Sequence, residues 1–214
     1  MIAPPERSPE RDAAIVAVLP HVPSAGWTRA ALLAAMRDLG LPPTDAAILF
    51  PGGVSDLLEA FADWSDRRME AEGGSLDLAA RPLHERVRAL ILLRLAQKRR
   101  HKEAVRRAVA LLALPRHAGL AARVLARTVD AIWHAAGDRT ADFSWYTKRA
   151  TLAGIYGATM LFWLADDSDD DAATIAFLDR RLARVAGIGR LRRRAVECVR
   201  RLRPGTGGAA AEAT

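Results

Sequence analysis

Hydrophobic residues recur every three or four positions along almost the whole chain, and no segment keeps the strict alternation of a half-buried strand. This spacing is typical of amphipathic helices. Helix breakers such as Pro20, Gly40 and Pro115 end segments, and Thr28 and Thr44 can cap the next ones. The predicted helices cover residues 9–19, 29–39, 45–50, a segment that Ser55 caps and Gly73 ends, a segment that begins at Pro82, 102–114, 120–136, 143–165, a segment from Ile175 to Val185, and 188–202.

The order of these helices predicts the fold class. Three short helices precede a longer one and a larger helical body, which is the layout of TetR-type repressors, and the stretch from Gly26-Trp27-Thr28 to Leu57-Leu58 resembles their helix-turn-helix start. We therefore predict an all-α, TetR-like fold of about nine to ten helices. Its expected divisions are a helix-turn-helix-like lobe at 1–54, a helical body at 55–203 that ends in a basic amphipathic helix at 188–203, and a disordered tail at 204–214.

Composition and charge narrow the class of protein. Half of the 214 residues are hydrophobic, so the chain can bury a full core, and its one cysteine, Cys198, excludes an intrachain disulfide. Residues 1–80 carry a net charge of −6 and residues 81–214 carry +13, so we expect an anionic partner at the second part. The first residues resemble neither a signal peptide nor a transit peptide. We therefore expect a bacterial protein, cytoplasmic and peripheral to the inner face of the membrane.

Functional DNA binding is not expected. The segment that would read DNA, residues 43–50, contains no Lys or Arg, and its one charge is Asp45. Because affinity for DNA depends on neutralising phosphates, an acidic lobe without cations in its recognition segment is a poor reader. The alternative is a retained structural module or a surface for protein contacts.

The sequence offers little catalytic chemistry. The five His are scattered, without the spacing of a zinc or di-iron site, so we predict no metal, no cofactor and no catalytic residue. His134 follows Asp130 by four residues, which permits a dyad but is more often a local hydrogen bond. The acidic string at 166–171 lacks the Gly and Glu of a calcium loop. Acidic side chains at this place are better explained as stabilising the positive N-terminal end of the next helix. We predict a non-enzyme.

One run, residues 128–159, carries a specific signature. It resembles that of the Coq-nine family, the ubiquinone-biosynthesis accessory proteins, and the likeness extends over roughly residues 12–187. The matching pieces are Asp130-x-x-Trp133, Ala136-Gly137-Asp138, Asp142-Phe143, Trp145-Tyr146-Thr147-Lys148-Arg149-Ala150 and Leu152-Ala153-x-x-Tyr156, with Leu19-Pro20-His21-Val22-Pro23 before them and Phe177-Leu178-Asp179-Arg180-Arg181 after them.

The resemblance implies an apolar cavity that binds an isoprenoid quinone or a phospholipid. The segment 143–165 is apolar on nearly all sides, and Gly154 and Gly157 would be tolerated there if they make room for a crossing helix or for a ligand. A helix crossing is the usual explanation, and the resemblance favours the ligand. The candidate lipid-binding residues are Trp133, Leu152, Ile155, Tyr156 and Met160.

The resemblance also implies two surfaces. One docks the di-iron demethoxyubiquinone hydroxylase, and its candidate residues are Asp142, Phe143, Trp145, Tyr146 and Arg149. The other is the C-terminal basic helix, which is expected to contact an anionic membrane, although a solvated helix packed on the body is an even alternative. Its candidate residues are Arg190, Leu191, Arg192, Arg193, Arg194, Val199 and Leu202.

The leading hypothesis is a non-catalytic lipid-binding accessory protein of ubiquinone biosynthesis that presents quinone intermediates to the hydroxylase. We expect a homodimer, as in TetR-like proteins. The first alternative is a TetR-type transcriptional regulator with a small apolar ligand. The second is a membrane-associated enzyme with an unrecognised site.

Overall fold

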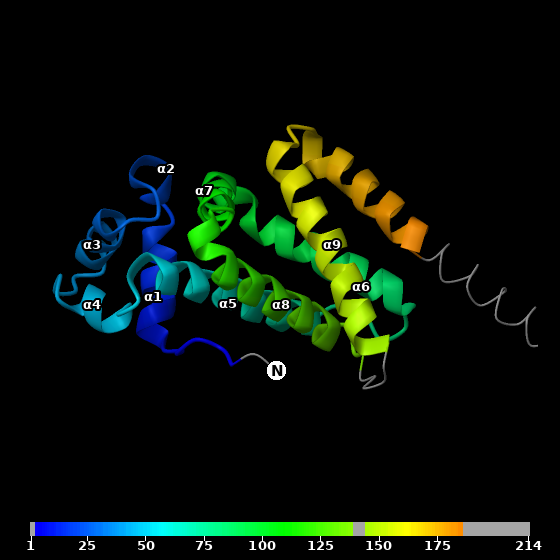
Figure 1. Cartoon of the computed structure of the whole chain (residues 1–214), viewed down its shortest axis with the longest axis horizontal. Coiled ribbons are helices and arrows are strands. Elements are labelled where there is room, and N and C mark those ends of the chain that lie inside the picture. The colour runs from blue at the N-terminus through cyan, green and yellow to red at the C-terminus, as the bar shows by residue number, and fades with distance from the viewer. Residues whose placement is uncertain (1–2, 139–143, 186–214) are drawn as a thin grey trace, which may run out of the picture.

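The computed structural model describes residues 3–138 and 144–185, except for the side chains of residues 144 and 145, and its regular structure is all helical in this part of the chain (Figure 1). The predicted all-α class is therefore confirmed. The helices are α1 Pro9–Val18, α2 Val22–Ala25, α3 Arg29–Asp38, α4 Asp45–Leu49, α5 Gly53–Gly74, α6 Leu83–Lys98, α7 Lys102–Leu112, α8 Ala118–Ala135, α9 Ser144–Ala165 and a last helix at 172–185.

The predicted helices agree with the observed ones within about two residues at most ends, which is the scatter that fraying produces. Two caps were wrong. Helix α5 begins at Gly53, whose φ of +63° suits glycine, so Ser55 lies inside the helix. Thr44 precedes α4, but its side chain makes no capping hydrogen bond and contacts Asp45 instead. The short helix α2 was not predicted, because four residues are too few for a periodic pattern. The predicted helix at 188–202 and the tail at 204–214 lie outside the described residues.

Helices α1 to α4 form one end of the molecule and are held to the rest by buried polar contacts (Figure 1). The Trp27 indole Nε1 donates a hydrogen bond to the carbonyl oxygen of Ala104 in α7 over 2.8 Å, and its ring packs at 5.0 Å from Phe61 of α5. The buried Arg11 guanidinium lies 2.6 Å from Asp56 and also donates to the Leu49 carbonyl. Two of these contacts are made to α5, which therefore connects the N-terminal helices to the remaining ones.

The remaining helices surround a common core. Helices α5 and α8 run alongside each other, α6 and α9 pack on them, and the helix at 172–185 turns back beside α9 (Figure 1). The turn is fixed by Asp166, whose carboxylate accepts hydrogen bonds from the backbone N–H groups of Ser168 at 2.9 Å and Thr174 at 2.8 Å. Hydrogen bonds from the side chains of Ser168 and Thr174, with the two backbone bonds added to them, hold the pKa of Asp166 below its ordinary value. Stacking of Phe162 on Phe177 at 4.4 Å joins the two helices.

No single helix among the described residues is long and apolar enough to cross a membrane. Two consecutive helical segments, Leu83–Leu112 and Pro115–Ala135, are together long and apolar enough by length and composition alone, but the chain bends by 93° between them.

Candidate ligand-binding site

A mostly apolar cavity of about 290 Å³ lies among helices α5, α6, α7, α8 and α9. Its size is close to the lower end of the range of small-molecule sites. The lining residues are Leu58, Phe61, Ala62, Arg94, Lys98, Val105, Ala108, Val109, Leu112, Ala113, Ala121, Val124, Leu125, Thr128, Tyr156, Gly157, Met160 and Leu161.

Small residues on the lining helices leave this space unfilled. Ala62, Ala108 and Ala121 present only a methyl group, and Gly157 presents none. A Cβ atom at Gly157 would have no neighbouring heavy atom within 4 Å outside its own turn of helix. Because glycine weakens a helix interior by roughly 1 kcal/mol relative to alanine, and no packed neighbour requires it here, Gly157 has the effect of keeping the cavity open.

The two ends of the cavity differ. Ala113 and Leu161 are exposed, with Leu161 at 60% of its full accessibility, so the apolar rim reaches the surface between the α7–α8 connection and α9. The floor is buried and contains the cavity's two cations, Arg94 and Lys98, both from α6. The cavity is thus apolar at its opening and polar at its base.

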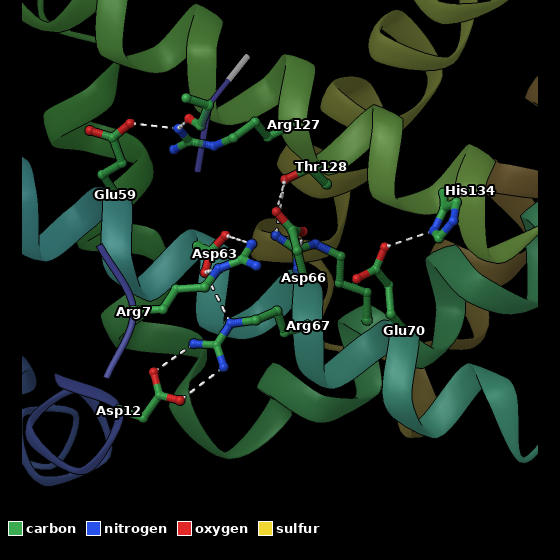
Figure 2. A network of polar contacts seen from close by, with 12 residues as sticks. Arg7, Asp12, Glu59, Asp63, Asp66, Arg67, Glu70, Arg127, Thr128 and His134 are labelled. Carbon is green, nitrogen blue, oxygen red and sulfur yellow. Dashed lines mark hydrogen bonds and ion pairs between the residues drawn. The ribbon is translucent and has the colours of Figure 1, made fainter. Parts of the chain in front are cut away.

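The Arg94 guanidinium contacts residues from three other helices. It lies 2.7 Å from Asp66 of α5, and it donates hydrogen bonds to the Tyr156 hydroxyl of α9 at 2.9 Å and to Thr128 Oγ1 of α8 at 3.2 Å. Thr128 in turn donates to Asp66 over 3.1 Å, the contact that Figure 2 draws between α8 and α5. Burial raises the pKa of the Tyr156 hydroxyl, so it stays protonated.

The second cation, Lys98, is different. Only 7% of Lys98 is exposed, and within the described residues its amine makes neither a hydrogen bond nor an ion pair; its nearest ring contact is Phe61, with the centroid at 5.4 Å. Burial lowers the pKa of Lys98 well below its ordinary value, and the neighbouring Arg94 lowers it further, while Asp66 opposes the shift. The floor therefore holds two basic groups and one acid.

Helix α5 also takes part in a separate network of ion pairs (Figure 2). Its members come from α5, α8 and the segment around α1, and none of them lines the cavity. The pairs are Arg7 with Asp63 at 2.6 Å, Arg67 with Asp12 at 2.6 Å and with Asp63 at 3.0 Å, Arg127 with Glu59 at 2.7 Å, and His134 with Glu70 at 3.5 Å.

The predicted lipid-binding residues occupy three kinds of position. Tyr156 and Met160 line the cavity. Leu152 and Ile155 are buried core residues outside the lining, and Trp133 is half-buried against the core. Sequence reasoning missed the polar floor, although a signal was present.

That signal lies in the helical register of α6. Val87, Ile91, Arg94 and Lys98 follow one another at spacings of four, three and four residues, so the two cations continue the apolar stripe of the helix. A charged residue on an apolar stripe is uncommon in a core and indicates a special site.

The predicted hydroxylase-docking residues are only partly described. Asp142, Phe143 and the side chain of Trp145 lie outside the described residues. Tyr146 is 75% exposed, and Arg149 Nε donates to Asp130 Oδ1 over 2.5 Å.

The possible dyad of Asp130 with His134 is not formed. Asp130 pairs with Arg149, and His134 Nδ1 lies 3.5 Å from Glu70 instead. The predicted membrane-binding residues, Arg190, Leu191, Arg192, Arg193, Arg194, Val199 and Leu202, all lie outside the described residues.

The fold defines the class as TetR-like. A crystal structure titled as the TetR transcriptional regulator from Nitrosomonas europaea matches with a TM-score of 0.68 and 23% identity, over 84% of this chain and 99% of that chain. Such a likeness carries information about the fold alone, and it confirms the TetR-like prediction.

The sequence comparisons then show which proteins the chain is similar to. The family model described as COQ9 matches residues 118–189. The chain is 34% identical to ubiquinone biosynthesis protein COQ9, mitochondrial, of Rattus norvegicus, over 82% of this chain and 58% of that protein. The human protein of the same name is 33% identical over 82% and 57%, and that of Drosophila melanogaster 35% over 78% and 52%. These matches confirm the resemblance to the COQ9 family.

Two qualifications follow from the same matches. The chain spans slightly more than half the length of the curated relatives it matches. The expectation of a cytoplasmic protein at the inner face of a bacterial membrane was wrong, because these relatives are named as mitochondrial proteins. That expectation rested on first residues that resemble neither a signal peptide nor a transit peptide.

The buried amine makes a prediction about stability. Lys98→Met replaces it by an apolar side chain of similar length and should stabilise the empty protein by about 1 kcal/mol or more at pH 7. Because the pKa of Lys98 is lowered on folding, the unfolded state binds the extra proton, and wild-type stability rises with pH toward the ordinary lysine pKa of 10.5. The difference in stability between the variant and the wild type should therefore be smaller at about pH 9.5 than at pH 7.

Denaturant unfolding at both pH values measures this difference. Arg100→Met is the matched control, since Arg100 is exposed two residues away and its loss removes the same charge. It should change stability by no more than about 0.5 kcal/mol. A Lys98→Met variant that is less stable than the wild type at both pH values would contradict the account of the floor.

Proposed function

We propose that this chain is a non-catalytic lipid-binding accessory protein of ubiquinone biosynthesis. In this proposal the cavity among α5 to α9 binds an isoprenoid quinone intermediate, or a phospholipid, and the protein presents the quinone to the di-iron demethoxyubiquinone hydroxylase. The observation that carries the proposal is a mostly apolar cavity, open at an apolar rim, in a chain similar to proteins named for ubiquinone biosynthesis.

The cavity chemistry supports a lipid over a polar metabolite. Sixteen of the eighteen lining residues are uncharged, and the opening beside Leu161 is apolar. Transfer of apolar surface from water stabilises a complex by roughly 25 cal/mol per Å². An acyl or prenyl chain is the ligand that gains most from such a lining.

A TetR-type transcriptional regulator is the second candidate, and the TetR-like fold is the observation that favours it. The first helices offer it little support. Helix α4 and its flanks, residues 43–50, have no Lys or Arg, and Ile48 is 73% exposed where a polar reader would be expected. A gel shift with the upstream region of its own gene distinguishes the two candidates.

Three further parts of the proposal rest on the sequence resemblance. The surface around Trp145 and Tyr146 docks the hydroxylase, the basic segment 188–203 contacts an anionic membrane, and the protein acts as a homodimer. The exposure of Tyr146 is compatible with the first of these.

The cavity proposal makes a prediction with a matched pair of variants. Gly157→Leu places an isobutyl group in the cavity and should abolish rescue of ubiquinone production in a strain that lacks the gene. Gly154→Leu lies on the same helix, where a Cβ also meets nothing within 4 Å, but Gly154 is exposed and outside the lining. It should rescue fully. Quinones and their intermediates are quantified by chromatography.

Both variants should fold, because each replaces a helical glycine at a gain of up to roughly 1 kcal/mol in helix propensity. Thermal unfolding of the purified proteins checks this. Full rescue by a folded Gly157→Leu variant would exclude the cavity as the functional site.

The docking proposal predicts a different defect. Trp145→Ala should leave the fold and the bound lipid nearly unchanged. It should remove co-purification with the hydroxylase and block quinone maturation, because a single aromatic anchor can contribute about 2 kcal/mol or more to the binding free energy of an interface. Pull-down with tagged hydroxylase and quinone analysis measure both effects. Wild-type complementation would remove the docking claim, and an unfolded variant would instead place Trp145 in the core.

A further inference from the structure

The two ends of the cavity give a ligand a direction. The rim at Ala113 and Leu161 is apolar and exposed, while the floor, at Arg94 and Lys98, is cationic and buried. An amphiphile placed with its head at the rim would leave a charged floor against hydrocarbon. An amphiphile with its head at the floor would place its polar group against the basic side chains and its apolar chain against the apolar rim.

Lys98 differs from Arg94 in that its amine makes neither a hydrogen bond nor an ion pair within the described part of the chain. Arg94 already contacts Asp66, Thr128 and Tyr156. The one acid of the floor, Asp66, is in turn engaged by Arg94 and Thr128. Lys98 lines the cavity and the residue is more than nine-tenths buried, so its amine, which has no partner among the described residues, is a donor available to a bound molecule.

Fold stability does not explain this lysine. A buried amine without a partner costs free energy, and a methionine would fill the same position with apolar atoms. The cost is understandable if a bound molecule supplies the acceptor. Because Asp66 already pairs with Arg94, a ligand with one acidic group, whose proton the Lys98 amine can take up, suits the floor best.

We infer that Lys98 is the headgroup subsite of the cavity, which binds an amphiphile head-first, with one acidic oxygen group on Lys98 beside Arg94 and the apolar chain directed toward Leu161. The inference rests on the proposed function in taking the cavity as the lipid site. It adds the chemical class of the ligand: a single-chain amphiphile whose head is a monoanionic oxygen acid such as a carboxylate or a phenolate.

A pair of probes tests the headgroup. Dodecanoate and dodecanol have the same chain and differ in the acidic group, and each is titrated into the full-length protein by calorimetry. The wild type should bind dodecanoate about tenfold more tightly or better, as a charge-assisted hydrogen bond implies. Lys98→Met should lose this preference by weakening dodecanoate alone, and Arg100→Met, which removes an exposed charge nearby, should keep it.

Gly157→Leu locates the probes, because it should block both of them if they occupy the cavity. Equal binding of the two probes by the wild type, or an unchanged preference in Lys98→Met, would overturn the headgroup inference while leaving the cavity as a lipid site. Binding of neither probe would overturn the inference and count against the proposed function as well. Retained dodecanol binding shows that Lys98→Met is folded.

Discussion

The buried ion pair of Asp66 and Arg94 is the contact on which the architecture of the site depends. It joins α5 to α6 at the floor of the cavity, and through Thr128 and Tyr156 it also includes α8 and α9. Four of the five cavity helices therefore meet at one polar cluster. Removing one partner of a buried pair costs roughly 3–5 kcal/mol, because the other charge is left without compensation.

This cluster also explains why the cavity can stay open. Apolar helices tend to close over empty space, since voids forfeit dispersion contacts. Here directional bonds fix the helix spacing at the floor, and small residues on α5, α7, α8 and α9 leave the volume above it unfilled. The arrangement leaves the Lys98 amine beside this ion pair without an acceptor of its own among the described residues. The polar cluster at the floor thus accounts together for the fixed helix spacing, the open volume and the unpaired Lys98 amine.

The fold was accessible from the sequence because helical periodicity, caps and breakers are local signals. Thr28 illustrates this: it was expected to cap a helix, and its side chain accepts from the N–H of Ala31. The site was less accessible. Tyr156 and Met160 were named as candidates and line the cavity, but Leu152 and Ile155 share their helix and point into the core. A helix that is apolar on nearly all sides does not reveal which side faces a void.

Charge was the property least readable from the sequence. The net charge of the first 80 residues suggested an acidic surface, yet Glu59 and Asp66 are paired in the fold with Arg127 and Arg94. These two pairs join the first 80 residues to the later part of the chain, so a separate count of charge for each part misses them. The lack of Lys and Arg at 43–50 is the part of the DNA argument that does not depend on such pairing.

The central claim is that the cavity binds a lipid. Native mass spectrometry of the purified protein, followed by solvent extraction and identification of the released molecules, tests it most directly. The account predicts a bound amphiphile with an isoprenoid or acyl chain, at about one per chain, that survives gentle purification. The account would be contradicted if the measured mass equals that of the polypeptide alone and does not increase after incubation with a membrane lipid extract.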